Sequence, residues 1–194
     1  WAQKNFGEAI EWLSASLIAN KQTEDADALL SHALAETPDE GLGGMINLIQ
    51  RGIGGRKDYA AQAKVWGDAA RDMDQTAPAY PVVVLLEVNC LVAAEQYDDA
   101  AKAVDALIKD RPKSEYAAYA ARQVKPGILA RQKKPAEAAE ALKDAIQTFS
   151  IFALPRHTEQ LADYHADAGD FQSAVKAVDQ LLGQPQWPFR KLEL

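Results

Sequence analysis

Five segments of this sequence share one pattern, and the last of them reads Phe171-Gln-Ser-Ala-Val-Lys-Ala-Val178. The four earlier copies begin at Thr23, Tyr59, Tyr97 and Pro135, so that successive first residues are 36, 38, 38 and 36 residues apart. A nearly constant period of this length is typical of repeat proteins, in which each repeat packs on its neighbours. The spacing therefore predicts five structural repeats along the chain.

Within each segment, the third, seventh and tenth residues after the first are almost all apolar. At 3.6 residues per turn, these offsets return to one face of a helix. The five stripes are Ala26/Leu30/Ala33, Gln62/Trp66/Ala69, Ala100/Val104/Leu107, Ala138/Leu142/Ala145 and Ala174/Val178/Leu181. Gln62 is the single polar exception. Short polar or glycine turns precede the segments, which predicts tight corners between antiparallel helices.

A partner helix is expected upstream of each corner. These helices are predicted near residues 6–19, 42–53, 81–94, 114–132 and 155–169. Local propensity alone favours a strand at Val82-Val83-Val84, but the repeat frame requires a helix there. Pro126-Gly127 predicts a kink or a split in the fourth partner helix.

These residues resemble the tetratricopeptide repeat family, whose motif has a small residue followed four positions later by a bulky one and then a closing proline. The matching pairs are Ala26/Leu30, Ala100/Val104, Ala138/Leu142 and Ala174/Val178. The resemblance covers essentially the whole chain. The first-helix half of the motif is weak throughout, and the spacing exceeds the usual value of about 34 residues. The sequence therefore looks like a divergent member of this class.

The resemblance implies an all-α fold, in which about five antiparallel helix pairs form a right-handed superhelix. We expect one domain over residues 1–194, with approximate repeats at 5–39, 40–77, 78–113, 114–150 and 151–186 and a C-terminal tail at 187–194. It also implies a non-catalytic scaffold that binds a partner peptide or protein in its concave groove. No cofactor is expected.

Register within the frame predicts which side chains face that groove. They are Asn47, Arg51, Leu85, Asn89, Val92 and Gln123, with acidic flanks at Glu8, Glu11, Glu159 and Asp163 and with Arg156 beside them. The paired lysines of the family's carboxylate clamp are absent, so binding of a free C-terminus is not expected. The remaining surface suits a partly apolar peptide with some basic residues. The alternative interpretation is an ordinary solvated helix surface.

A basic cluster provides a second candidate surface in this acidic chain. It consists of Arg122, Lys125, Arg131, Lys133 and Lys134, with no acidic residue between Glu115 and Glu137. Such a cluster can dock an acidic partner, although cations also gather near helix C-termini for electrostatic reasons alone. The alternative function is a self-assembly module, a homo-oligomer built through this cluster and the tail aromatics Trp187 and Phe189. The same aromatics can instead cap the last repeat.

Composition excludes several other classes of function. The net charge of −7 and the pI near 5.0 argue against nucleic-acid binding, which needs a basic field. No apolar run approaches the roughly 18 to 20 residues of a membrane span. The single cysteine, Cys90, excludes an internal disulfide and is expected in the core. The first residue, Trp1, suggests a processed or excised chain, and cytoplasm and periplasm are both compatible with the sequence.

The residues that could support catalysis or bind a metal do not form a known pattern. One predicted helix carries His157, Glu159, Asp163, His165 and Asp167. The two histidines lie two helical turns apart, and neither is followed by the glutamate of an HExxH zinc motif. Packing histidines are therefore expected, and no metal site is predicted. The glycines around 41–44 and 52–55 lack the Gly-Lys-Ser/Thr of a phosphate loop.

Overall fold

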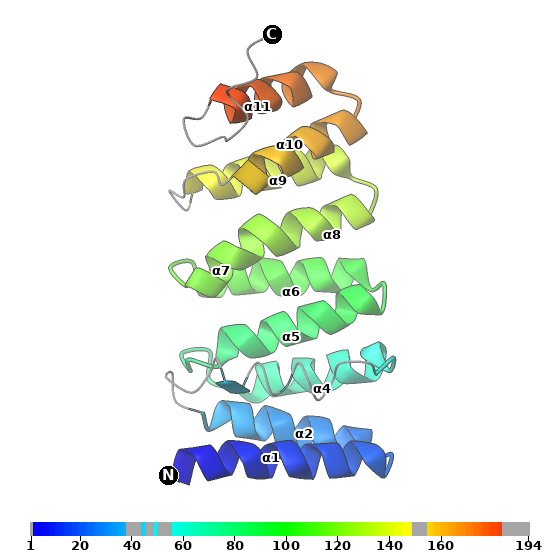
Figure 1. Ribbon diagram of the computed structural model, residues 1–194, viewed down its shortest axis with the longest axis vertical. Coiled ribbons are helices and arrows are strands. Elements are labelled where there is room, and N and C mark those ends of the chain that lie inside the picture. Colours follow the sequence, from blue (N-terminus) through cyan, green and yellow to red (C-terminus); the bar gives the residue numbers. More distant parts are fainter. Residues whose placement is uncertain (1, 38–43, 46–48, 50–55, 149–154, 184–194) are drawn as a thin grey trace. The chain divides into compact units, whose positions relative to one another are not determined.

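The computed structural model describes residues 2–37, 44–45, 49, 56–148 and 155–183, and every regular element in these ranges is a helix (Figure 1). The chain groups into two compact units, Trp1–Pro112 (unit 1) and Lys113–Leu194 (unit 2). The all-α class with helices packed in adjacent pairs is confirmed. A single superhelical domain over the whole chain stays a prediction.

Unit 1 contains two complete helix pairs and the second helix of another pair. Its helices are α1 (Ala2–Ala19), α2 (Thr23–Ala35), α4 (Tyr59–Asp72), α5 (Tyr80–Ala93) and α6 (Tyr97–Asp110). Contacts join α1 to α2, α2 to α4, α4 to α5 and α5 to α6. The partner helix predicted at 42–53 lies mostly outside the described residues, although Met45 and Ile49 in that stretch are buried. The helix predicted across Val82–Val84 is confirmed by α5.

Unit 2 contains the last two pairs. Its elements are α7 (Glu115–Tyr119), the π-helix η2 (Ala120–Val124), α8 (Lys125–Arg131), α9 (Pro135–Thr148), α10 (Pro155–Asp167) and α11 (Phe171–Gly183). The succession α7–η2–α8 is one partner helix with a changed hydrogen-bond pattern in its middle. This confirms that Pro126-Gly127 interrupts a regular α-helix.

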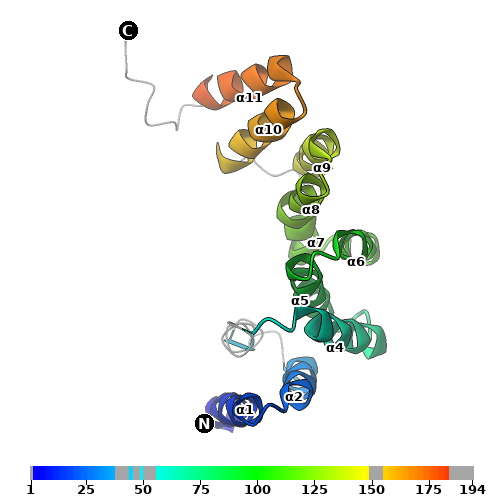
Figure 2. The same ribbon diagram turned by 90° about the vertical axis from the view of Figure 1, so that its right-hand side faces the viewer.

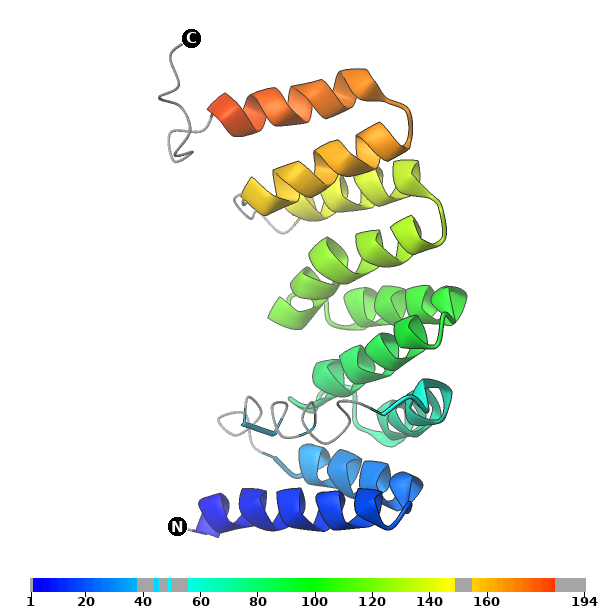
Figure 3. The same ribbon diagram turned by 45° about the vertical axis from the view of Figure 1, so that its right-hand side comes forward.

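Four of the corners share one geometry, and Figure 3 shows the turns that reverse the chain between α1 and α2, α5 and α6, α8 and α9, and α10 and α11. The second residue before each segment has a positive φ: Lys21 (62°), Glu95 (61°), Lys133 (61°) and Gly169 (78°). The next N–H donates to the carbonyl five residues earlier, as from Gln22 to Leu17 at 2.9 Å. This is the Schellman ending of a helix, which turns the chain sharply because one residue is left-handed. The predicted tight corners are thus confirmed here.

The predicted apolar stripes form the core. The small residues Ala26, Ala100 and Ala138 are fully enclosed, and so are the bulky residues Leu30, Trp66, Val104 and Leu142. A buried small residue lets two helices approach closely, and the bulky residue one turn later fills the space beside the contact. Only the last copy is open, since Val178 on α11 is 41% exposed. No further described helix covers that face of α11.

Gln62, the polar exception in the stripe, is part of a buried network rather than a flaw in the core. It is 1% exposed, its Nε2 donates to Asp58 Oδ1 at 2.9 Å, and its Oε1 accepts the Cys90 thiol at 3.7 Å. Buried polar groups are tolerated when they are hydrogen-bonded. Gln62 therefore connects α4 to α5 and to the residue before α4.

Arg56 joins the same network to α2. Its guanidinium donates to both Asp27 oxygens at 2.6 and 2.9 Å and to Asp58 Oδ1 at 3.0 Å. Hydrogen bonds from Arg56 lower the pKa of Asp58 to about 2. At Asp27, the effect of burial exceeds that of Arg56 and raises the pKa. The Asp27 and Arg56 side chains are 2% and 9% exposed, so this ion pair is removed from solvent.

Replacing Arg56 with Met tests this network. The change leaves the Asp27 carboxylate buried without its cation, so we expect a loss of about 3–5 kcal/mol in the free energy of unfolding. The double variant Asp27→Leu/Arg56→Met removes both charges and should recover most of that loss. Urea denaturation followed by circular dichroism measures both values. Wild-type stability in Arg56→Met would contradict the role assigned to the pair.

Candidate functional site

The structure brings three of the predicted groove residues together on α5. Leu85, Asn89 and Val92 are four and three residues apart, which places them on one helical face. Asn89 is exposed, and Leu85 and Val92 are half-buried on either side of it along the helix. Two other predicted groove residues, Asn47 and Arg51, lie outside the described residues. The α5 stripe, defined as Leu85, Asn89 and Val92, is the described core of this candidate site in unit 1.

Most of the rest of α5 is packed against neighbouring helices. Nine of its residues are buried, and its only charged side chain is Glu87. A face that only meets water usually carries charged residues. The α5 stripe instead presents a primary amide between two aliphatic side chains, which can pair with the backbone of a bound peptide and contact its apolar side chains.

In unit 2, a proline determines the shape of the corresponding helix. Pro126 has no N–H to donate to the carbonyl of Arg122, and its ring would collide with that carbonyl in a regular α-helix. The preceding turns widen, and the Lys125 N–H donates to the Ala120 carbonyl five residues earlier. Such π-helical turns are frequent at functional sites. This one presents Arg122 and Gln123.

Gln123, also a predicted groove residue, is engaged by a buried histidine. Its Nε2 lies 2.6 Å from Nε2 of His157 on α10, and the amide donates when that ring nitrogen is unprotonated. His157 is 1% exposed, and its Nδ1 has no hydrogen-bond partner among the described residues. Burial, together with the charges of Arg156 and Arg122, lowers the pKa of His157. The ring is therefore neutral near pH 7, and its hydrogen bond with Gln123 joins η2 to α10.

The structure separates the predicted basic cluster into two groups. Arg122 and Lys125 are half-buried at η2 and the start of α8, and the Arg122 Nε donates to the Ala118 carbonyl at 3.0 Å. Arg131, Lys133 and Lys134 are exposed at the turn between α8 and α9. At 1.5 Å per residue, Arg122 and Arg131 are roughly 13 Å apart along the helix axis. Together they form a basic edge rather than one compact pocket.

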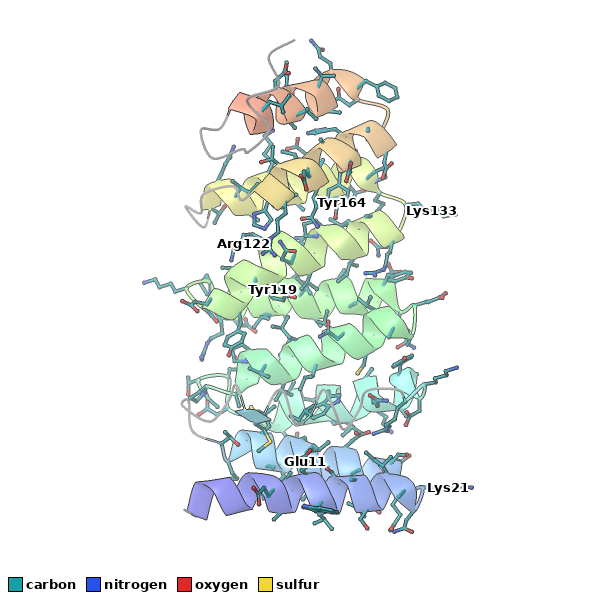
Figure 4. The ribbon with its side chains drawn as sticks, viewed as in Figure 1. Glu11, Lys21, Tyr119, Arg122, Lys133 and Tyr164 are labelled. Carbon is teal, nitrogen blue, oxygen red and sulfur yellow. The ribbon has the colours of Figure 1, made fainter. Side chains whose placement is uncertain are left out.

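Two tyrosines beside these cations were not predicted as site residues. Tyr119 is 50% exposed at the end of α7, and Tyr164 lies half-buried on α10. Figure 4 labels both tyrosines and Arg122, which lie on α7, α10 and η2 of unit 2. Tyrosine and arginine are enriched among the residues that dominate protein interfaces. The signal in the sequence was a tyrosine three residues before Arg122, which the repeat frame alone does not single out.

The described residues contain no group of three or more His, Cys, Asp or Glu that could hold a metal ion. His157 is used for packing, and His165 lies 3.8 Å from Asp170 at the α10–α11 turn. Cys90 is buried, and burial raises the pKa of its thiol to about 11, which keeps it protonated and unreactive. Within the described ranges, no helix is long and apolar enough to span a bilayer.

Comparison with known proteins supports the fold. No family model matches this sequence, and no curated protein matches it. The solved structure of the MamA RS-1 ArsTM double mutant matches with a TM-score of 0.55 and 12% identity, covering 91% of this chain and 92% of that chain. BtubC (BKLC) from P. vanneervenii matches with a TM-score of 0.60 and 15% identity, covering 96% and 85%.

MamA contains tetratricopeptide repeats, and both matches extend over most of each chain. The fold is therefore a tetratricopeptide-like helical repeat. At 12% and 15% identity, the likeness concerns the fold.

The contact between Gln123 and His157 predicts that the stability of the fold depends on pH. Because the folded-state pKa of His157 lies below its unfolded value of about 6.5, the neutral ring stabilises the fold above that pH. This contribution is lost as the pH falls below about 6.5. Between pH 7.5 and 5.5, we expect a larger fall in melting temperature for the wild type than for His157→Leu.

Circular dichroism at the two pH values measures the difference. His32→Leu is the matched control, since His32 is exposed on α2 and should leave the wild-type dependence unchanged. Equal falls in melting temperature in the wild type and in His157→Leu would contradict the role assigned to the contact between Gln123 and His157.

Proposed function

We propose that this chain is a non-catalytic scaffold that binds a partner peptide or protein through the exposed faces of its first helices. The observation that carries the proposal is the α5 stripe, an uncharged open face on a helix with nine buried residues. The tetratricopeptide-like neighbours support an interaction scaffold in general. The proposed groove residues are Asn47, Arg51, Leu85, Asn89, Val92 and Gln123.

The chemistry of the exposed faces indicates the kind of peptide that fits. Asn89 offers an amide donor and acceptor for a peptide backbone, while Leu85 and Val92 offer apolar contact on either side. Glu8 on α1 and Glu159 and Asp163 on α10 are exposed and acidic. A partly apolar peptide with some basic residues complements these surfaces. The basic edge from Arg122 to Lys134 is a second proposed docking surface, for an acidic segment.

A second candidate function is self-assembly, and the open face of α11 favours it. Phe171, Val175, Val178 and Leu182 recur at helical spacing and are 69%, 59%, 41% and 48% exposed. An apolar stripe of this kind usually covers another surface. The tail aromatics Trp187 and Phe189, which could cover it within one chain, lie outside the described residues.

Capture of partners by the immobilised chain, followed by mass spectrometry, tests the leading proposal. Asn89→Ala/Val92→Ser should reduce capture at least about tenfold, because both contacts lie in the stripe. Ile108→Ser/Lys109→Ala on α6 is the matched control, with one half-buried aliphatic and one exposed polar residue changed. Circular dichroism should show wild-type helicity for both variants.

If Asn89→Ala/Val92→Ser captures partners as well as the wild type does, the α5 stripe is not the binding surface. Light scattering of the same samples separates the two functions. A monomer that still captures partners supports the scaffold, and a dimer that captures none supports self-assembly.

A further inference from the structure

Each unit also has a cleft on the side of its second helices, and in unit 1 this cleft lies on another face of α5 than the α5 stripe. In unit 1, a cleft of about 520 Å³ lies between α4 and α6, with α5 as its floor. Figure 2 shows α4 and α6 on the same side of α5. In unit 2, a cleft of about 420 Å³ lies between α9 and α11, with α10 as its floor. The two clefts arise in the same way, from neighbouring second helices that each pack on the first helix between them.

The repeat frame shows which residues of the two clefts are equivalent. Glu87 lies ten residues before Tyr97, where α6 begins, and Leu161 lies ten residues before Phe171, where α11 begins. Both side chains line the floor of their cleft. Because Leu161 fills the position in unit 2, the fold itself does not require a carboxylate there.

Glu87 makes no hydrogen bond or ion pair within the described part of the chain, although the charge of Arg71 acts on its carboxylate. It is half-buried, and no hydrogen bond or ion pair from a described residue reaches its carboxylate. Burial, the largest cause, raises the pKa of Glu87. The nearby cations are already paired at the rim, Arg71 with Asp68 and Lys102 with Asp99, each at 2.8 Å. A half-buried carboxylate without a partner is costly, and a bound cation would offset that cost.

Gly67 on α4 accommodates this carboxylate. A Cβ added at Gly67 would lie 2.7 Å from Oε1 of Glu87, so a larger residue here would displace the end of the Glu87 side chain from its observed position. Glycine inside a helix costs about 1 kcal/mol relative to alanine. The equivalent position in α9, eight residues after the start of the segment, is Lys143. Gly67 and Glu87 thus occur together in one cleft, and Lys143 and Leu161 occur together in the other.

We propose that the cleft of unit 1 binds a lysine or arginine side chain of a partner peptide, with its cationic head on the Glu87 carboxylate. The apolar stem of that side chain would lie along Ala70, Val84 and Ala103, which line the same cleft. Charge-assisted hydrogen bonds to a carboxylate are stronger than neutral ones, and they would satisfy the one acidic group on the cleft floor. The cleft of unit 2 has Leu161 in that position and therefore has no carboxylate on its floor.

Selection from a random heptapeptide phage library on the immobilised full chain tests this assignment. We expect Lys or Arg to be enriched at one fixed position of the selected peptides. The strongest peptide should bind Glu87→Gln at least about tenfold more weakly, since a charge-assisted hydrogen bond is lost. Glu87→Leu copies the residue that unit 2 carries and should lose the cationic preference while keeping wild-type helicity.

Two controls make the result decisive. The same peptide with its cation replaced by norleucine should bind the wild-type chain at least about tenfold more weakly, which tests the proposal without changing the protein. Asn89→Ala/Val92→Ser should retain binding of the cationic peptide, because the α5 stripe lies on another face of α5. Selected peptides without a fixed Lys or Arg, or equal binding to wild type and Glu87→Gln, would overturn the assignment.

Discussion

The fold depends on close contact between helices at one repeated small residue. Ala26, Ala100 and Ala138 are fully enclosed, and each is followed one turn later by a bulky residue that is also enclosed. A single helix pair cannot bury such a stripe, so each pair needs a neighbour. Helix α5, which contacts α4 and α6, is consequently buried at nine positions, which is why the composition of the α5 stripe is informative about binding.

Two departures from this rule have physical explanations. Gln62 occupies the small-residue position of the second segment, yet its amide is satisfied by Asp58 and Cys90, and Arg56 extends the same network to α2. Polar networks of this kind favour one packing arrangement because alternatives leave a group unsatisfied. In α11, Phe171 and Val178 are exposed, because no later described helix covers that face. The stripe of a second helix is therefore fully enclosed only where a later helix packs on it, as α4 packs on α2.

Much of the fold could be predicted because its signals are local and repeated. The stripe offsets predicted the second helices, the turn residues predicted the corners, and the frame identified α5 as a helix despite Val82–Val84. The candidate sites were less accessible. The pairing of Gln123 with His157 and the approach of Glu87 to Gly67 join residues that are distant in sequence, and only tertiary packing brings them together. Nothing in the local pattern distinguishes Glu87 from an ordinary solvated glutamate.

The most direct test of the packing constraint compares two alanines of α9. Ala138 is fully enclosed at the repeated small position, whereas Ala136, two residues earlier on the same helix, is exposed. Enlarging a close-packed position typically costs about 1–3 kcal/mol. Urea denaturation should therefore show that Ala138→Leu lowers the free energy of unfolding by about that amount while Ala136→Leu leaves it unchanged. Equal stability of the two variants would contradict the claim that close contact at the small residue holds the repeats together.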